Sequence, residues 1–221
     1  MLKLKGLIID MDGTITKFNL DYVAARKRAL DELDRLGLRT PDMNEQVNLY
    51  VILNQLGERL EPTRFRELRA TLYKFFEEME VKAAEDATLL PGAANTLIEL
   101  RSKPLKIGLV TNNSRAGTDL TLKRLSLQTA FDAVVTRDDC EEMKPASAPI
   151  LKVLTELGVS PDAAILVGDG VLDIQAAKAA GVRSVAVTTG PFPIERILKA
   201  QPDYILSSIG DLPLLIEKLE S

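Results

Sequence analysis

Apolar residues follow two alternating patterns along this chain, short continuous runs and helical spacings, with turn residues between them. The short runs are rich in valine and isoleucine and predict buried strands over residues 4–10, 106–112, 133–136, 163–169, 184–189 and 204–206. The helical spacings predict helices over residues 92–102, 115–125, 146–157 and 171–180, and a last helix from residue 211. Strands that alternate with helices are typical of a doubly wound α/β fold, in which helices cover both faces of a parallel sheet.

One long segment departs from this alternation, since no strand pattern occurs between residues 18 and 86. A first helical pattern stops near Gly37, a second covers residues 44–56, and a third begins at Pro62 and continues through Met79. The segment is too long for a single crossover. We therefore expect an inserted all-α helical cap domain over residues 18–86, and a Rossmann-like core domain over residues 1–17 and 87–221.

Composition describes an ordinary soluble globular protein. The 221 residues are 46% hydrophobic and 27% charged, with a net charge of −4. The acidic balance and the lack of a basic run predict neither a nucleic-acid partner nor a membrane surface. No signal-peptide pattern or spanning apolar stretch occurs, and the single cysteine, Cys140, excludes an internal disulfide; both predict a cytoplasmic location.

The chain contains no histidine. This absence excludes Ser-His-Asp and Cys-His catalysis and every histidine-ligated metal site. Any acid–base chemistry must use carboxylates, lysine or tyrosine.

Polar residues stand where the predicted strands end, and ligands of doubly wound sheets bind at that edge. They are Asp10 and Asp12 after the first run, Thr111 and Asn112 after the second, Asp169 and Asp173 after the fourth, and Lys144 ahead of the fourth. Buried carboxylates are costly unless cations accompany them, so we expect Lys144 and a divalent cation among them. Ligation by oxygen alone favours Mg²⁺.

A carboxylate that faces a cation and a lysine is equipped for phosphoryl transfer. An aspartate can act as the nucleophile and form an acyl phosphate, which water then hydrolyses. A second aspartate two residues further on can protonate the leaving oxygen and later deprotonate that water.

These motifs, in this order, resemble the haloacid dehalogenase-like (HAD) hydrolase superfamily over nearly the whole chain. The similarity is greatest to its phosphoglycolate phosphatase-like members, which usually carry an α-helical cap where the helical segment falls. The segments that look like that branch are Leu90-Pro91-Gly92, Lys144-Pro145, residues 157–161, and Val167-Gly168-Asp169 through Ala180-Gly181.

The resemblance implies that Asp10 is the nucleophile and Asp12 the general acid and base. Mg²⁺ would be bound by the Asp10 carboxylate, the Asp12 backbone carbonyl and Asp169. Lys144 would steady the charge of Asp10 and of the phosphoryl group.

Three further roles are implied by the same resemblance. Thr111 and Asn112 would hold the phosphoryl group, and Asp173 would support the metal and lysine. One position departs from the family pattern, because Gly170 follows Asp169 where serine or threonine is commoner.

The resulting hypothesis is a Mg²⁺-dependent phosphatase that acts on a small phosphorylated metabolite through an aspartyl-phosphate intermediate. A sugar phosphomutase of the same superfamily and a non-catalytic binding module on the same scaffold remain alternatives. Retention of Asp12 disfavours a dehalogenase and a phosphonate hydrolase.

The sequence does not identify the substrate, and we expect a monomer or a weak homo-oligomer. Several arginines of the helical segment are candidates for substrate contact or for a solvated face: Arg26, Arg59, Arg64, Arg66 and Arg69.

Overall fold

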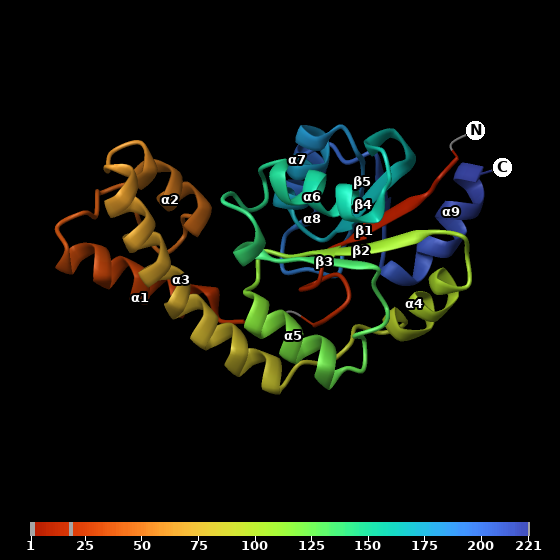
Figure 1. The fold of residues 1–221 in the computed structure, drawn as a ribbon, viewed down its shortest axis with the longest axis horizontal. Helices are drawn as coiled ribbons and strands as arrows, with labels where there is room; N and C mark the ends of the chain where they lie inside the picture. The colour runs from red at the N-terminus through yellow and green to blue at the C-terminus, as the bar shows by residue number, and fades with distance from the viewer. Residues whose placement is uncertain (1–2, 18–19, 221) are drawn as a thin grey trace.

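The computed structural model describes residues 3–17 and 20–220, and a parallel sheet lies at its centre (Figure 1). Within these residues the strand order is β3-β2-β1-β4-β5-β6, with every neighbouring pair parallel. The strands are β1 (Gly6–Ile9), β2 (Lys106–Val110), β3 (Ala133–Val135), β4 (Ala164–Gly168), β5 (Arg183–Val187) and β6 (Tyr204–Leu206). The chain starts at the centre and winds outward in both directions, which confirms the predicted doubly wound α/β fold.

Helices cover both faces of the sheet because side chains alternate along each strand. On β1, Leu7 and Ile9 join one buried cluster and Ile8 joins another. The first cluster includes residues of α4 (Ala93–Arg101), α5 (Arg115–Arg124) and α9 (Leu212–Glu220). The second includes residues of α6 (Ala148–Leu157) and α7 (Val171–Ala180). A short helix, α8 (Ile194–Lys199), was not predicted; it packs through Ile197 against Ala186.

Three helices follow β1 and form what we call the helical insert: α1 (Tyr22–Arg35), α2 (Leu49–Gly57) and α3 (Pro62–Glu85). They share a hydrophobic cluster of their own, which Met143 of the α/β part joins. The prediction that the second helix begins at residue 44 is wrong. The Asn44 side chain accepts a hydrogen bond from the Gln46 N–H, which makes a local turn, and Asn48 caps the helix by accepting from the Tyr50 N–H.

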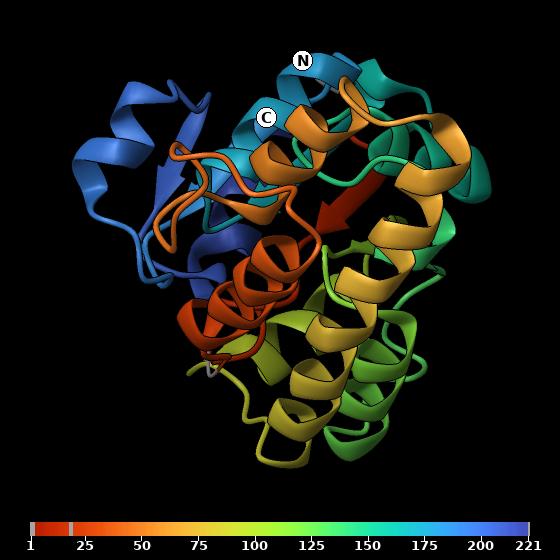
Figure 2. The ribbon, with the colours of Figure 1, turned by 90° about the vertical axis from the view of Figure 1, so that its left-hand side faces the viewer.

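Helix α3 of the insert is 24 residues long, and it packs against α1 and α2 and extends along the α/β part of the molecule. Its buried residues are spaced four apart: Leu68, Leu72, Phe76, Glu80 and Ala84. Its second half lies along α5, side by side in Figures 1 and 2. The predicted division of the chain at residue 86 stays a prediction, and its other boundary, at residue 18, lies outside the described residues.

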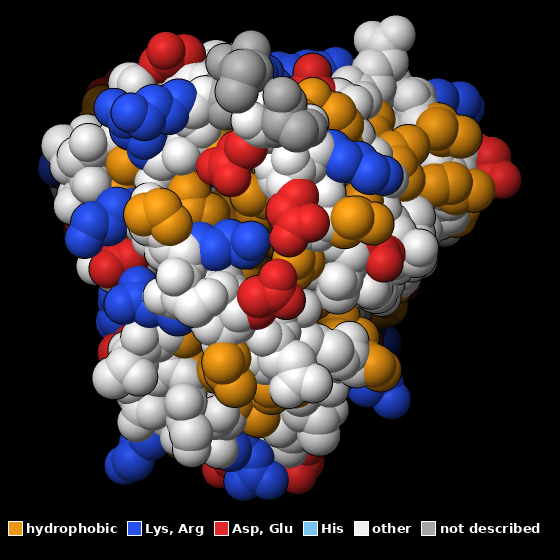
Figure 3. Space-filling model, turned by 90° about the vertical axis from the view of Figure 1, so that its right-hand side faces the viewer, with side chains coloured by type: hydrophobic (Ala, Val, Ile, Leu, Met, Phe, Trp, Pro, Cys, Tyr) orange, Lys and Arg blue, Asp and Glu red, His pale blue; other side chains and the backbone are white. Residues whose placement is uncertain are grey.

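The end of the molecule opposite the insert is formed by α4 and α9, which pack together. Each carries an exposed apolar side chain, Ile98 and Leu214. Figure 3 shows this end, where acidic and basic side chains stand between separate apolar ones. Across residues 3–17 and 20–220, no helix combines the length and apolar character needed to cross a membrane.

Candidate active site

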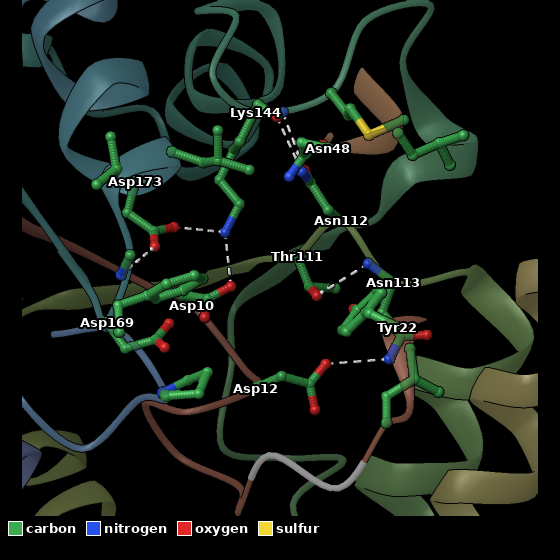
Figure 4. A pocket seen from close by; sticks show the side chains of 18 of the residues that line it. Asp10, Asp12, Tyr22, Asn48, Thr111, Asn112, Asn113, Lys144, Asp169 and Asp173 are labelled. Carbon is green, nitrogen blue, oxygen red and sulfur yellow. Dashed lines mark hydrogen bonds and ion pairs between the residues drawn. The ribbon is translucent and has the colours of Figure 1, made fainter. Parts of the chain in front are cut away.

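The carboxyl end of β1 delivers Asp10 to the middle of the sheet edge (Figure 4). Its backbone N–H continues the sheet pairing by donating to the Val167 carbonyl at 2.9 Å. The chain then turns at Gly13, where φ is +84°. A side chain at this position would be strained by that φ and would also overlap the Asp169 carboxylate, so the turn needs glycine for two reasons.

Lys144 lies at the centre of the predicted residues. Its Nζ donates to Oδ1 of Asp10 and to Oδ1 of Asp173, both at 2.6 Å, and to the Val110 carbonyl at 3.2 Å. The ammonium group thereby uses all three of its donors. Burial lowers the pKa of Lys144, but the two carboxylates outweigh that effect and raise it above its ordinary value, so this lysine stays charged.

The two aspartates that follow β4 have different surroundings. Asp173 lies in the first turn of α7, where its Oδ2 accepts from the Gly170 N–H at 3.0 Å. Asp169 is 6% exposed, and its Oδ2 is buried without a hydrogen-bond partner among the described residues. Burial, with the negative charges of Asp10 and Asp173, raises the pKa of Asp169 to about 9. Burial also raises the pKa of Asp10 to about 7, although Lys144 opposes this.

These carboxylates form a donor set that fits a divalent cation. One oxygen from each of Asp10, Asp169 and Asp173 lies within 4.8 Å of the others. Both oxygens of Asp173 already accept hydrogen bonds from Lys144 or Gly170, which leaves Asp10 and Asp169 with lone pairs to offer. A cation would satisfy the orphaned Asp169 oxygen and keep both carboxylates deprotonated. Oxygen donors select a hard ion of the Mg²⁺ type.

Asp12 is set apart from this acidic cluster. Its Oδ1 accepts from the Thr16 hydroxyl and its Oδ2 from Nδ2 of Asn113, both at 3.1 Å. Burial raises the pKa of Asp12, which favours the protonated form that a general acid needs. Asn113 was not singled out by the sequence, although its place directly after Asn112 was a usable signal.

The two residues after β2 are used differently. Oγ1 of Thr111 accepts from the Asn113 N–H at 3.1 Å, so its hydroxyl hydrogen can be donated elsewhere. Asn112 donates from Nδ2 to the Lys144 carbonyl and accepts at Oδ1 from the Lys144 N–H, both at 2.9 Å. Its amide therefore holds the Lys144 main chain. The predicted contact of Thr111 and Asn112 with a phosphoryl group stays a prediction.

A second pair of charges, Glu80 and Arg137, is buried next to the loop that follows β2. The sequence reasoning missed both. The available signal was Glu80 itself, an acid at a position where the spacing of Leu72, Phe76 and Ala84 calls for an apolar residue. An acid in such a stripe requires a buried partner.

A cavity of about 450 Å³ lies between the strand ends and the helical insert. The α/β part contributes all seven predicted residues, five from the segments that directly follow strands, Lys144 from the segment ahead of α6 and Asp173 from α7. The insert contributes Tyr22, Arg26 and Asn48, and the segment around α8 contributes Phe192 and Arg196. Burial and the nearby Asp12 and Glu80 raise the pKa of Tyr22 well above its ordinary value, so Tyr22 keeps its proton at neutral pH.

Comparison with known proteins places this arrangement in a family. The haloacid dehalogenase-like hydrolase family matches residues 7–187. Proteins named phosphoglycolate phosphatase from Escherichia coli (strain K12) and from Shigella dysenteriae are 41% and 34% identical to the chain, each over 95% of the chain and 91% of the relative. The chain therefore belongs to the haloacid dehalogenase-like hydrolase family.

Solved structures share the fold. A hydrolase from Pseudomonas syringae is 24% identical with a TM-score of 0.71, covering 98% of this chain and 100% of its own. A HAD-superfamily hydrolase from Geobacter sulfurreducens is 23% identical with a TM-score of 0.60, covering 97% of each chain. At these identities the likeness concerns the fold alone.

Proposed function

We propose that this protein is a Mg²⁺-dependent phosphatase that hydrolyses a small phosphorylated metabolite through an aspartyl-phosphate intermediate. The observation that carries the proposal is the grouping, in one cavity, of the Asp10 carboxylate, the Lys144 ammonium and the unpartnered Asp169 oxygen. The relatives named phosphoglycolate phosphatase support the same reaction class.

In the first step, a carboxylate oxygen of Asp10 attacks the phosphorus of the bound ester. A bond forms between that oxygen and phosphorus while the bond from phosphorus to the leaving oxygen breaks. Asp12 gives its proton to the leaving oxygen, and the alcohol departs. Lys144, which contacts Asp10 at 2.6 Å, holds the nucleophile in place and neutralises charge on the transferring group.

In the second step, water attacks the phosphorus of the acyl phosphate. Asp12, now a carboxylate, takes the proton from the water, and the bond between phosphorus and the Asp10 oxygen breaks. Inorganic phosphate leaves, and both aspartates return to their starting protonation states. Thr111 would donate its hydroxyl hydrogen to the phosphoryl oxygens, and Asn112 would keep Lys144 in position.

The cation would be held by the carboxylates of Asp10 and Asp169 and by the backbone carbonyl of Asp12. When bound, it would offset the negative charge of the phosphoryl oxygens and orient the ester for in-line attack. Asp173 would act indirectly, by fixing Lys144 at 2.6 Å.

For the substrate, we propose a small acidic phosphate ester such as phosphoglycolate. The names of the relatives point to it, and the cavity carries guanidinium groups in addition to Lys144. Arg26 on α1 and Arg196 on α8 both line the cavity. A guanidinium group suits a carboxylate on the substrate.

A panel of phosphorylated metabolites, assayed for phosphate release with and without Mg²⁺, tests the function. We expect Mg²⁺-dependent turnover with phosphoglycolate among the best substrates, and none from the matched D10N variant. Transfer of phosphate between positions of a sugar, without phosphate release, would indicate the phosphomutase alternative. Absence of turnover on every ester, with binding retained, would indicate the binding-module alternative and overturn the proposal.

A further inference from the structure

The buried pair formed by Glu80 and Arg137 links the helical insert to the α/β part. Glu80 lies in the second half of α3, and Arg137 follows the carboxyl end of β3. The guanidinium binds the carboxylate with two parallel hydrogen bonds, NH1 to Oε1 at 2.7 Å and NH2 to Oε2 at 2.9 Å. The two residues are only 1% and 3% exposed, and the ring of Tyr73 lies 4.6 Å from the guanidinium carbon. Both charges are therefore removed from water and paired with each other, while Nε of Arg137 has no hydrogen-bond partner among the described residues.

The same two residues bind the main chain of the loop after β2, through both side chains and one backbone group. The Ser114 N–H donates to Oε2 of Glu80 at 3.0 Å. Arg137 donates from NH1 to the Asn112 carbonyl and from its own backbone N–H to the Asn113 carbonyl, both at 3.1 Å. Three successive residues of the loop thus each have a backbone group fixed by the pair.

This loop positions two groups of the proposed reaction. The Asn112 amide holds both the N–H and the carbonyl of Lys144, and the Asn113 amide donates to the Asp12 carboxylate. A shift of the loop backbone would move both contacts together. Neither Glu80 nor Arg137 contacts Asp10 or Asp12 through any hydrogen bond found among the described residues, although Arg137 also lines the cavity.

We propose that Glu80 and Arg137 are positioning residues. They act through the loop of residues 111–114 to hold Lys144 and Asp12 in the correct position relative to Asp10. The proposal rests on the proposed phosphatase function. It gives the insert a part in catalysis itself, because α3 supplies Glu80 to a loop that belongs to the sheet.

A purely structural role makes a different prediction. Helix α3 is already held in place by its buried apolar residues, Leu68, Leu72, Phe76 and Ala84, and by its packing along α5. A buried ion pair adds little net stability compared with apolar residues of similar volume, although removal of one partner alone is strongly destabilising. Replacement of both partners by methionine therefore separates a role in holding α3 in place from a role in positioning the loop. It removes the side-chain contacts to the loop without leaving an unpaired charge, and it keeps the backbone bond from residue 137 to the Asn113 carbonyl.

The test compares E80M/R137M with the parent protein on an aryl phosphate and on an alkyl phosphate, with Mg²⁺ present. We expect kcat to fall about 100-fold, because small displacements of catalytic groups cost that much, while KM changes by less than about threefold. The loss should be greater for the alkyl ester, which depends on proton donation by Asp12. The melting temperature should stay close to that of the parent.

The matched control is R28M/E78M. Arg28 and Glu78 form an ion pair at 3.0 Å that also involves α3, but both side chains are about half exposed. No hydrogen bond found in the described part of the chain joins this pair to the loop of residues 111–114. This control should keep parental kcat and KM for both esters.

Two conservative variants, E80Q and R137K, keep the proposal testable if the double variant does not fold. In each variant, kcat should fall by a larger factor than KM changes. Hydrogen exchange of the backbone N–H groups of residues 111–114 should become faster. Parental kcat in a folded E80M/R137M, or in both conservative variants, would overturn the positioning role. An inactive parent protein would instead overturn the phosphatase function, and the positioning role with it.

Discussion

The edge of the sheet and the helical insert border the same cavity, yet the sequence is far more informative about one than about the other. Parallel strands end at a common edge, so a polar residue just after an apolar run has a defined place in space. Asp10, Thr111 and Asp169 all follow this rule. A residue on an inserted helix has no such rule, since its place depends on how the insert packs. Catalytic residues at strand ends can therefore be predicted from the sequence, whereas residues that an insert supplies to the site cannot.

The largest expected effect lies on the sheet side of this comparison. Asp10→Asn removes the proposed nucleophile and should lower kcat by at least about 10⁴-fold, as loss of a nucleophile does in other enzymes. Circular dichroism should show an unchanged fold, because asparagine keeps the volume of the side chain. Activity above a trace level in folded D10N would contradict the covalent mechanism. Beryllium fluoride should bind against Asp10 in the parent and fail to bind in the variant.

A smaller and substrate-dependent effect is expected for Asp12. In Asp12→Asn, hydrolysis of an alkyl phosphate should slow by about 10³-fold and that of an aryl phosphate by about tenfold, because an aryl leaving group needs less protonation. Steady-state kinetics on matched ester pairs measures the difference. Equal losses on both esters would show that Asp12 has a structural role.

Metal binding should appear as a pH-dependent gain in stability. The pKa of Asp169 is about 9 in the folded chain against an ordinary 3.8, so the folded state holds this proton more tightly. The resulting contribution favours folding below about pH 4 and is lost as the pH rises toward 9. Mg²⁺ at about 100 times its Kd should add about 2.7 kcal/mol, or roughly 5–10 °C in Tm. The gain should be larger at pH 8 than at pH 6, where protons compete.

Asp169→Asn is the control for this measurement. An asparagine is neutral without binding a proton, so the metal-free variant avoids the cost of protonating a buried carboxyl group at pH 8. It should therefore melt at a higher temperature than the metal-free parent at pH 8, and added Mg²⁺ should not shift its Tm. Thermal scans of both proteins with EDTA and with Mg²⁺ decide the matter. An equal shift in parent and variant would place the cation elsewhere.

The smallest expected effect lies on the insert side. Arg26→Met should raise KM for phosphoglycolate by about tenfold, the effect of one charged hydrogen bond, with kcat and the hydrolysis of an aryl phosphate unchanged. Arg59→Met is the matched control, since Arg59 is an exposed arginine of the insert that does not line the cavity. An unchanged KM in R26M would assign selectivity to other groups.

The sequence predicted the six strands, the helices on the sheet and the place of the helical insert. These elements could be predicted because the spacing of apolar residues within each segment indicates its secondary structure. It missed α8, whose six residues are too few to show a period, and it began α2 too early, where two asparagines form a turn and a cap. At the site, the residues that reach the cavity from strand ends were found. Asn113, Glu80 and Arg137 were not, since their importance lies in contacts between distant segments.

The length of α3 has a consequence for engineering. Its 24 residues extend over about 36 Å and pack both against α1 and α2 and against α5 of the α/β part, so the insert is not an exchangeable module as a whole. A chimaera that takes a foreign segment up to Glu85 would discard the acceptor for the Ser114 N–H and the partner of Arg137. A graft intended to change selectivity should join the foreign segment ahead of Tyr73, whose ring lies over Arg137, and keep residues 73–85 of the host.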